Sequence, residues 1–358
     1  MQLQYVASNA GEDGIMPIRR RGFNYGGVKV LERPATPQDA EVCKGWRQDQ
    51  AVMLPGMLQD VLTAYAPQIA QAHSLMEATL NGADVAELFE GEPYSTQLKP
   101  AFELVAASME EHDEQGIEKI YFDAWDGDEL VADNLWCKAS WLSFEDEDAS
   151  LRFRFSFGME GFEDVAADPA RQNWAARLTD AIFPESAAIT EHVELNRLLT
   201  QVLDGDTPAY AERIVYFNAP NGGAQMHHDV ERGHEGVVFA QLSGATFWLA
   251  AAKPVLMDEV AAFLATTDAD AWLELKALVA DRAAFAEYLD DRDHELAEAL
   301  MDREPEFFRY MIEHGYAFIL EAGDVLLLPQ KTLETCVWHS VICVGDAPGE
   351  ALSFAIRR

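Results

Sequence analysis

Positively charged residues are scarce in this sequence. The 26 lysines and arginines stand against 62 aspartates and glutamates, so the formal net charge is −36. A chain this acidic repels the phosphate backbone of nucleic acids and anionic membrane surfaces, so we expect neither as a partner. The charge is compatible with a basic peptide or protein as substrate, and it also favours solubility. One basic cluster, Arg19-Arg20-Arg21, is expected to pair with acidic groups of the chain itself.

Cysteines and long apolar runs are also few. The chain has four cysteines and no CxxC pair, and their neighbours are apolar or aromatic, so we expect buried free thiols. No apolar run is long enough to cross a bilayer, and the first residues lack the basic and apolar regions of a signal peptide. These absences favour a cytoplasmic protein in a reducing compartment. The sequence leaves the oligomeric state open, a homodimer included.

Apolar residues make up 49% of the 358 residues, which is enough for a large core. Residues 1–114 are predicted as a mainly helical N-terminal region, because apolar residues recur at three- and four-residue spacing over residues 51–89 and 98–111. Residues 255–314 are rich in Ala, Leu and Glu and poor in β-branched residues, which predicts a helical insertion.

Short β-rich segments predict strands from about residue 117 onward. The run from Leu151 to Phe157 alternates strictly, which predicts a strand with its phenylalanines on one face. Arg152 and Arg154 lie on the other face, where we expect them to be exposed and paired with carboxylates. Further predicted strands are residues 213–218, 237–242, 246–250, 317–320, 324–328, 337–344 and 352–356.

Two histidines and an aspartate lie next to or within such segments. His227 and Asp229 follow a Gly-rich turn at residues 220–223, and His339 lies far downstream. Two imidazoles and one carboxylate on one side of a metal leave other coordination positions open, as in non-haem Fe(II) sites that use oxygen. The sequence therefore predicts that these three residues bind a metal and form the catalytic centre. The alternative is that they are ordinary core residues.

Two other histidines compete for the same role. His228 lies between His227 and Asp229, so in an extended segment its side chain points to the opposite face. A ligand set centred on His228 would also lack a carboxylate two residues later, because that residue is Val230. His234 stands in a predicted loop, where we expect it at the surface or near a substrate.

These motifs resemble those of the cupin-like, JmjC-type Fe(II)/2-oxoglutarate-dependent oxygenases. The resemblance covers residues 213–358, and the residues that carry it are His227-His228-Asp229, Gly244, Phe247-Trp248-Leu249, Gly323-Asp324, Pro329 and His339. It implies an α+β fold with a double-stranded β-helix, the jelly-roll core of cupins. This core would span residues 115–358 and contain the helical insertion.

The resemblance also implies an activity and two cofactors. Fe(II) would be bound by His227, Asp229 and His339, and oxidation would be coupled to decarboxylation of 2-oxoglutarate. The expected substrate is a peptide, a protein side chain or a small molecule derived from an amino acid. Two alternatives stay open: a metal-dependent cupin enzyme that does not use 2-oxoglutarate, and a non-catalytic cupin-like module that binds a basic partner.

A cation is needed to hold the distal carboxylate of 2-oxoglutarate. Related enzymes often place a lysine two residues after the hairpin glycine, where this chain has Thr246. Others place an arginine on the last strand, where this chain has Arg357, whose planar guanidinium suits a carboxylate. Arg213 is the second candidate and Lys253 the third. The side chains expected to hydrogen-bond the cosubstrate or the metal ligands are Gln225, Thr246, Ser353 and Tyr216.

Overall fold

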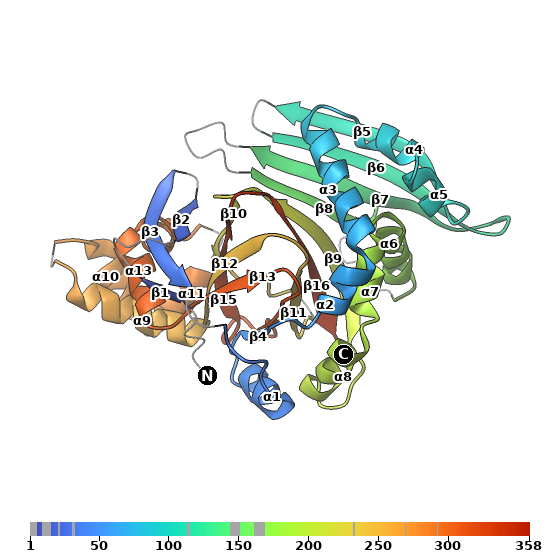
Figure 1. The fold of residues 1–358 in the computed structure, drawn as a ribbon. Coiled ribbons are helices and arrows are strands. Elements are labelled where there is room, and N and C mark those ends of the chain that lie inside the picture. Colours follow the sequence, from blue (N-terminus) through green and yellow to red (C-terminus); the bar gives the residue numbers. More distant parts are fainter. Residues whose placement is uncertain are drawn as a thin grey trace.

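Two antiparallel sheets face each other around the centre of the molecule (Figure 1). The computed structural model describes residues 6–8, 16–20, 22–30, 33–112, 115–143, 151–160, 169–231, 233–268, 270–291 and 293–358. Within these residues the fold is mixed, with a large antiparallel sheet, smaller antiparallel sheets and surrounding helices.

The strand orders define the sheets. The large sheet runs β4 (Val52–Leu54), β14 (Val325–Pro329), β11 (Gly236–Gln241), β16 (Gly349–Arg357), β9 (Ala209–Asn218), β8 (Leu151–Met159), β7 (Glu129–Ser143), β6 (Gln115–Asp126) and β5 (Phe102–His112). The sheet that faces its first half runs β10 (Gly223–His227), β15 (Val337–Val344), β12 (Ala245–Ala252) and β13 (Ala317–Glu321). An N-terminal sheet runs β1 (Val6–Ser8), β3 (Phe23–Val30) and β2 (Met16–Arg20).

Helices form two groups. The first group is α1 (Asp39–Arg47), α2 (Gln59–Ala64), α3 (Ala66–Leu80), α4 (Val85–Glu90), α5 (Tyr94–Leu98), α6 (Pro169–Ile182), α7 (Pro184–Thr190) and α8 (Val193–Val202). The second group lies between β12 and β13 in the chain: α9 (Lys253–Thr266), α10 (Leu273–Val279), α11 (Arg282–Asp290), α12 (Glu295–Arg303) and α13 (Pro305–Glu313). In Figure 1 the two groups lie on opposite sides of the facing sheets. The span expected as a helical insertion therefore holds α9 to α13.

Alternation along the strands decides which side chains enter which core. On β8, Phe155 is fully buried and packs against Phe183 beside α7, whereas Arg154 points to the other face. A second core lies between the two facing sheets and the helical insertion. There Phe239 of β11 meets Trp248 of β12 at a ring-centroid distance of 4.8 Å. This second core supports the candidate site.

The N-terminal region differs from the sequence prediction. Residues 98–111 were expected to be helical, but α5 ends at Leu98 and β5 begins at Phe102. Pro100 has no amide hydrogen and cannot continue a helix. The following residues pair with β6 along the whole of β5, and this pairing outweighs the helical preference of their side chains. The described part of the first 114 residues is therefore part helix and part strand.

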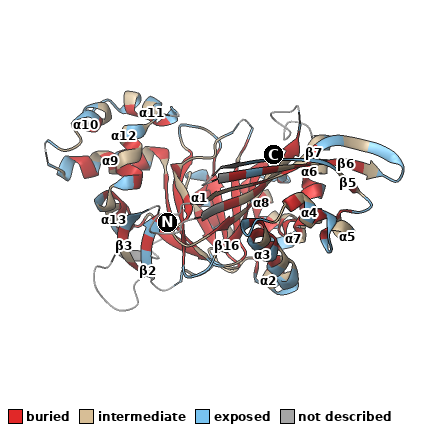
Figure 2. Ribbon diagram, turned by 90° about the horizontal axis from the view of Figure 1, so that it is seen from above, coloured by how far each residue is buried: buried red, intermediate tan, exposed pale blue. Residues whose placement is uncertain are grey.

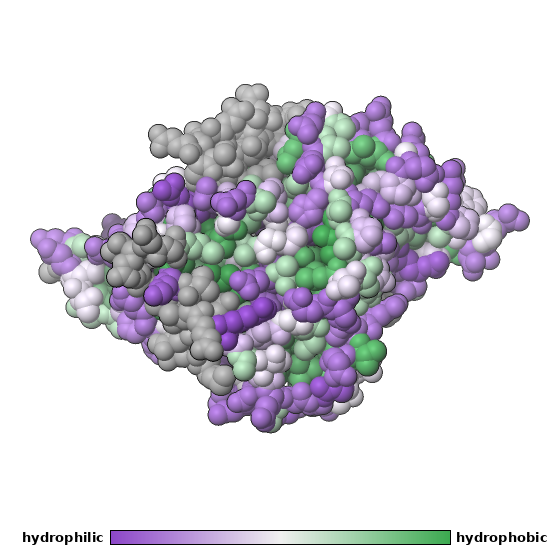
Figure 3. Space-filling view, viewed as in Figure 1, coloured by the Kyte–Doolittle hydropathy of each residue, from purple (hydrophilic) through white to green (hydrophobic). Residues whose placement is uncertain are grey.

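The face shown in Figure 3 is mostly hydrophilic, with small hydrophobic patches between charged side chains. In Figure 2 the sheets are mostly red at the centre of the molecule, whereas the outer strands β5 to β7 are largely pale blue and tan. None of the described helices combines the length and the apolar composition needed to cross a membrane.

Two buried carboxyl groups lie where β16 meets α7. Glu350 and Glu185 are both 0% exposed. Burial raises the pKa of Glu185 to about 7. Burial, followed by the charge of Glu185, raises the pKa of Glu350 well above that of an exposed glutamate. Folding therefore favours the protonated form of this pair.

We expect the stability of the protein to fall as the pH rises through neutrality. A group whose pKa is raised by folding stabilises the folded state at low pH and loses that contribution as the pH passes its folded pKa. The free energy of unfolding should drop by about 1 kcal/mol per pH unit from about pH 5 to 7, between the ordinary pKa of a glutamate and that of folded Glu185. Urea denaturation of wild type and Glu350→Gln at several pH values tests this. The variant should have the flatter profile, and parallel profiles would contradict the assignment.

Candidate metal centre

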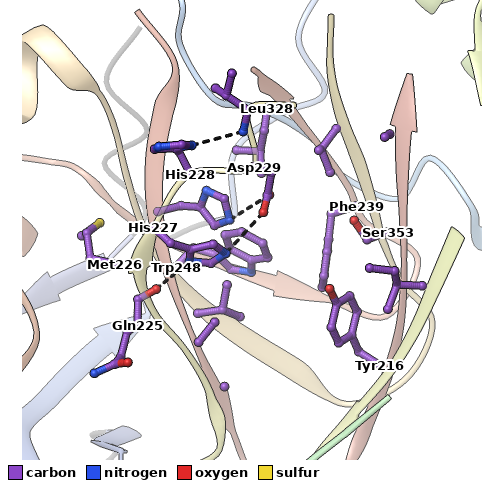
Figure 4. A pocket seen from close by; sticks show the side chains of 18 of the residues that line it. Tyr216, Gln225, Met226, His227, His228, Asp229, Phe239, Trp248, Leu328 and Ser353 are labelled. Carbon is purple, nitrogen blue, oxygen red and sulfur yellow. Dashed lines mark hydrogen bonds and ion pairs between the residues drawn. The ribbon is translucent and has the colours of Figure 1, made fainter. Parts of the chain in front are cut away.

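The three predicted metal ligands come from two neighbouring strands. His227 is the last residue of β10, and His339 on β15 is its direct partner in the antiparallel pair. Their ring centroids are 4.3 Å apart. Asp229 follows β10, with Oδ1 3.4 Å from His227 Nε2 and Oδ2 3.4 Å from His339 Nε2. One ligand atom from each residue lies within 4.8 Å of the others (Figure 4).

Hydrogen bonds orient both imidazole rings. Nδ1 of His227 lies 2.6 Å from the carbonyl oxygen of Gln225, and Nδ1 of His339 lies 3.3 Å from that of Val337. A carbonyl only accepts, so each Nδ1 carries the proton and Nε2 keeps its lone pair toward Asp229. Trp248 stacks on the His339 ring at a centroid distance of 5.4 Å. The rings are thus held in the tautomer and orientation that metal binding requires.

The local charges favour the ligand forms of His339 and Asp229. Burial, with a smaller contribution from His227, lowers the pKa of His339 to about 4. Burial alone would raise the pKa of Asp229, but the adjacent His339 and His227 hold it well below its usual range. Burial would also lower the pKa of His227, but its contact with Asp229 raises the pKa above the ordinary value. A neutral imidazole and a carboxylate are the forms that bind metals.

A pocket of about 580 Å³ opens beside these residues. The side chains of His227 and Asp229 stay 38% and 37% exposed toward it, whereas His339 is 3% exposed. The strands β9, β11 and β16 form the opposite wall, on which Tyr216 and Ser353 lie (Figure 4). The pocket is large enough for a small molecule or a side chain of a substrate. The ligand set therefore has one closed side and one side open to the pocket.

The fit to a divalent transition metal rests on this donor set. Two imidazole nitrogens and a carboxylate oxygen on one side are the 2-His-1-carboxylate arrangement of non-haem Fe(II) sites. A second group of side chains, Glu212, Glu231 and His234, also has ligand atoms within 4.8 Å of one another. Glu231 in that group is exposed, and burial raises the pKa of Glu212 to about 7. The first group is the better metal site because its carboxylate is ionised and its rings are oriented.

The helical insertion holds β10 in place. Oδ1 of Asp302, on α12, accepts hydrogen bonds from the backbone N–H of Met226 at 2.9 Å and from Arg20 at 2.7 Å. Arg20 also donates to the carbonyl oxygen of Ala224 at 3.0 Å. The Asp302 and Arg20 side chains are 2% and 4% exposed. Arg20 of the basic N-terminal cluster is thus paired with an acidic group, as expected. Their shared contact reaches Met226, the residue before the predicted metal ligand His227.

Asp302→Ala should destabilise the protein strongly. It leaves Arg20 buried without its counter-ion, and loss of one partner of a buried pair costs about 3–5 kcal/mol. Urea denaturation measures the change. Asp258→Ala is the matched control, because Asp258 pairs with Arg282 on the same insertion but both side chains are more than half exposed. The control should lose less than about 1 kcal/mol. Equal losses in the two variants would show that the buried pair has no special role.

Three of the four side chains predicted to hydrogen-bond the cosubstrate or the metal ligands line the pocket: Tyr216, Gln225 and Ser353. Ser353 lies in the wall, and Gln225 lies beside the ligands and donates to Glu298 at 2.9 Å. Thr246 is 2% exposed and is not in the wall; it donates to Gln241 and accepts from Trp248, both at 2.8 Å.

The three predicted cations lie outside the pocket wall. Arg213 points to the opposite face of β9 and pairs with Asp180 of α6. Lys253 is buried and pairs with Asp290 of α11. The Arg357 guanidinium lies beside Gly233, about 3.7 Å from where a Cβ would stand there, and its charge acts to lower the pKa of Glu212.

Arg154 is a pocket residue that the sequence interpretation did not select as part of the site. It lies on β8 directly opposite Tyr216 of β9, and both line the pocket. Its Nε donates to Ser140 on β7 at 3.2 Å. The alternation of β8 predicted the face on which Arg154 lies, but only the pairing with β9 makes that face continuous with the pocket. No local signal in the sequence could have shown this pairing.

The other two candidate histidines, His228 and His234, both line the pocket. His228 lines the pocket, and its Nδ1 accepts from the backbone N–H of Val230 at 3.2 Å. Its ring packs against Trp338 at a centroid distance of 5.2 Å. His234 is 3% exposed, so the surface position expected from the sequence is wrong.

The chain has a loose structural similarity to solved proteins. No family model matches the chain, and no curated protein matches it. A solved structure described as an oxidoreductase of the 2OG-Fe(II) oxygenase family, from Burkholderia pseudomallei, aligns with 91% of this chain and 93% of its own chain. The sequence identity is 12% and the TM-score is 0.33. At that TM-score the similarity carries no argument about what this chain binds or catalyses.

Proposed function

We propose that β9 to β16 form a double-stranded β-helix around the pocket. The strand orders support this: β9-β16-β11-β14 are neighbours in one sheet and β10-β15-β12-β13 in the other. Successive strands therefore alternate between the two sheets, except at β12 and β13, where the helical insertion intervenes. Such winding is typical of jelly-roll folds.

The proposed activity is that of an Fe(II)- and 2-oxoglutarate-dependent oxygenase. The observation that carries it is the convergence of His227, Asp229 and His339 beside an open pocket, with both imidazoles 3.4 Å from the carboxylate. Iron bound there would supply oxygen chemistry coupled to the decarboxylation of 2-oxoglutarate. The substrate class proposed is a peptide, a protein side chain or a small molecule derived from an amino acid.

The protein's own residues would position the reactants. His227, His339 and Asp229 would hold the metal on one side, and Trp248 would keep the His339 ring in place. Tyr216 and Ser353 offer hydroxyl groups on the opposite wall. Among the described residues that line the pocket, Arg154 is the cationic side chain, so we assign to it the distal carboxylate of 2-oxoglutarate. Arg357 remains the alternative anchor, from its place on the last strand.

Succinate release from 2-oxoglutarate tests this function. Purified protein with Fe(II) and 2-oxoglutarate should form succinate slowly even without the substrate, and His339→Ala should form none. If the protein binds the metal but leaves 2-oxoglutarate unchanged, a metal-dependent cupin enzyme with another cosubstrate becomes the better proposal. If it binds no metal, the non-catalytic module remains.

A further inference from the structure

One face of the large sheet carries cations and leads into the pocket. On β6 and β7, Lys119 and Lys138 are direct partners across the strand pair. On β8, Arg154 is the partner of Ser140, two residues along from Lys138. The helices α3 to α7 lie on one side of this sheet in Figure 2, and the fully buried Glu118 of β6 points toward them to accept from the N-terminus of α4. Side chains alternate along each strand, so Lys119, Lys138 and Arg154 lie on the face of the sheet opposite to these helices.

These cations are poorly neutralised for so acidic a chain. Lys119 pairs with Glu160. Lys138 and Arg154 have no carboxylate within ion-pair distance among the residues that the structure describes; Arg154 donates to the Ser140 hydroxyl instead. Burial, then the charges of Arg154 and Lys119, lowers the pKa of Lys138. Among the described residues, two half-buried cations thus lie side by side without a carboxylate partner, and an anion from outside the chain would neutralise them.

Two aromatic rings complete this face. The Lys119 ammonium lies 5.0 Å from the ring centroid of Tyr121 and 5.2 Å from that of Trp136. Lys138 lies 5.7 Å from the same Trp136 ring. The rings hold the ammonium groups without neutralising their charge. We call Lys119, Tyr121, Trp136, Lys138 and Arg154 the basic face.

The basic face extends outward from the pocket. Neighbouring strands lie about 4.8 Å apart, so Arg154 in the wall, Lys138 one strand further and Lys119 on the next strand cover roughly 10 Å. A single small anion would need only one of these positions. A row of cations suits an elongated ligand with several negative charges.

The acidic side chains near the ligand set do not oppose such a ligand strongly. Asp302 is paired with Arg20. Glu298 accepts from Arg303 and from Gln225. The charges of these two pocket-lining carboxylates are therefore partly neutralised.

We infer that the basic face binds an extended, acidic segment of a polypeptide and directs one of its side chains into the pocket. The oxidation of that side chain rests on the proposed function, in which Arg154 holds 2-oxoglutarate. The binding does not, because Lys119 and Lys138 remain for the acidic segment. A nucleic acid fits less well, because its dense and continuous phosphate charge meets three cations on this face. The inferred ligand is acidic, whereas the composition alone suggested a basic one.

Fluorescence anisotropy with labelled decapeptides tests this inference. The probe is a rhodamine-labelled (Glu-Gly)5 peptide, titrated with the full-length protein at low ionic strength without metal or 2-oxoglutarate. Lys138→Gln should weaken binding about tenfold and Lys138→Arg should retain it. Lys44→Gln, an equal loss of charge on an exposed residue of α1, should bind like wild type.

The outcomes separate this inference from the proposed function. Equal binding by wild type and Lys138→Gln, or no binding at all, would overturn the inference, as would tighter binding of (Lys-Gly)5 or a ten-nucleotide thymidine strand. Thermal unfolding shows whether Lys138→Gln is folded. If it is not, retained peptide binding by Lys138→Arg supports the inference and lost binding contradicts it. Succinate release is measured separately, so its failure with intact peptide binding would overturn only the proposed function.

Discussion

His339→Ala should abolish metal binding. His339 is the most enclosed of the three ligands, with 3% of its side chain exposed, and its Nε2 faces Asp229 at 3.4 Å. Its removal leaves one imidazole and one carboxylate, too few protein ligands to hold a first-row metal in an open site. Affinity for Mn(II), measured by calorimetry, should fall by more than about 100-fold. Loss of a hydrogen-bond partner that only orients a metal ligand already lowers metal affinity by about 10–100-fold.

His228→Ala is the matched control for this experiment. It removes an imidazole from the same pocket, but one whose Nδ1 is engaged by the backbone N–H of Val230. Mn(II) affinity should change only a few-fold. If His228→Ala loses the metal and His339→Ala keeps it, the ligand assignment is wrong.

Arg154→Gln should raise the KM for 2-oxoglutarate by about 10- to 100-fold. The reason is that a charge-assisted hydrogen bond to a carboxylate contributes about 1.5–3 kcal/mol, and glutamine keeps a donor but not the charge. Mn(II) affinity should stay unchanged, because Arg154 lies on β8, across the pocket from the ligands. Succinate release at varied 2-oxoglutarate concentration measures the effect.

Arg357→Gln separates the two candidate anchors. Arg357 lies beside Gly233 and outside the pocket wall, so its replacement should change the KM for 2-oxoglutarate less than about twofold. A large increase in this variant, with Arg154→Gln unaffected, would favour the anchor suggested by sequence resemblance.

Local patterns in the sequence predicted the parts of this molecule that depend on local chemistry. The strict alternation at residues 151–157 predicted β8, and the Ala- and Leu-rich span predicted helices where α9 to α13 lie. The short spacing of His227 and Asp229 was enough to select them as a pair. Their approach to His339 depended on the resemblance, because more than a hundred residues separate the two strands.

Long-range pairing set the limits of prediction. Residues 102–112 have helix-forming side chains, and only β6 makes them a strand. Arg154 looked like an ordinary exposed arginine, because nothing in the sequence shows that β8 lies next to β9. Arg213 was expected in the pocket but lies on the other face of β9, where Asp180 of α6 is its partner. These outcomes depend on which strands are neighbours, which periodicity does not reveal.

Anomalous diffraction from crystals grown with Mn(II) and 2-oxoglutarate tests the central claim most directly. We expect one manganese peak per chain, about 2.0–2.3 Å from Nε2 of His227, Nε2 of His339 and one carboxylate oxygen of Asp229. The 2-oxoglutarate should occupy the open side, toward Tyr216 and Ser353. A peak at Glu212, Glu231 and His234 instead, or no peak between the two histidines, would contradict the account.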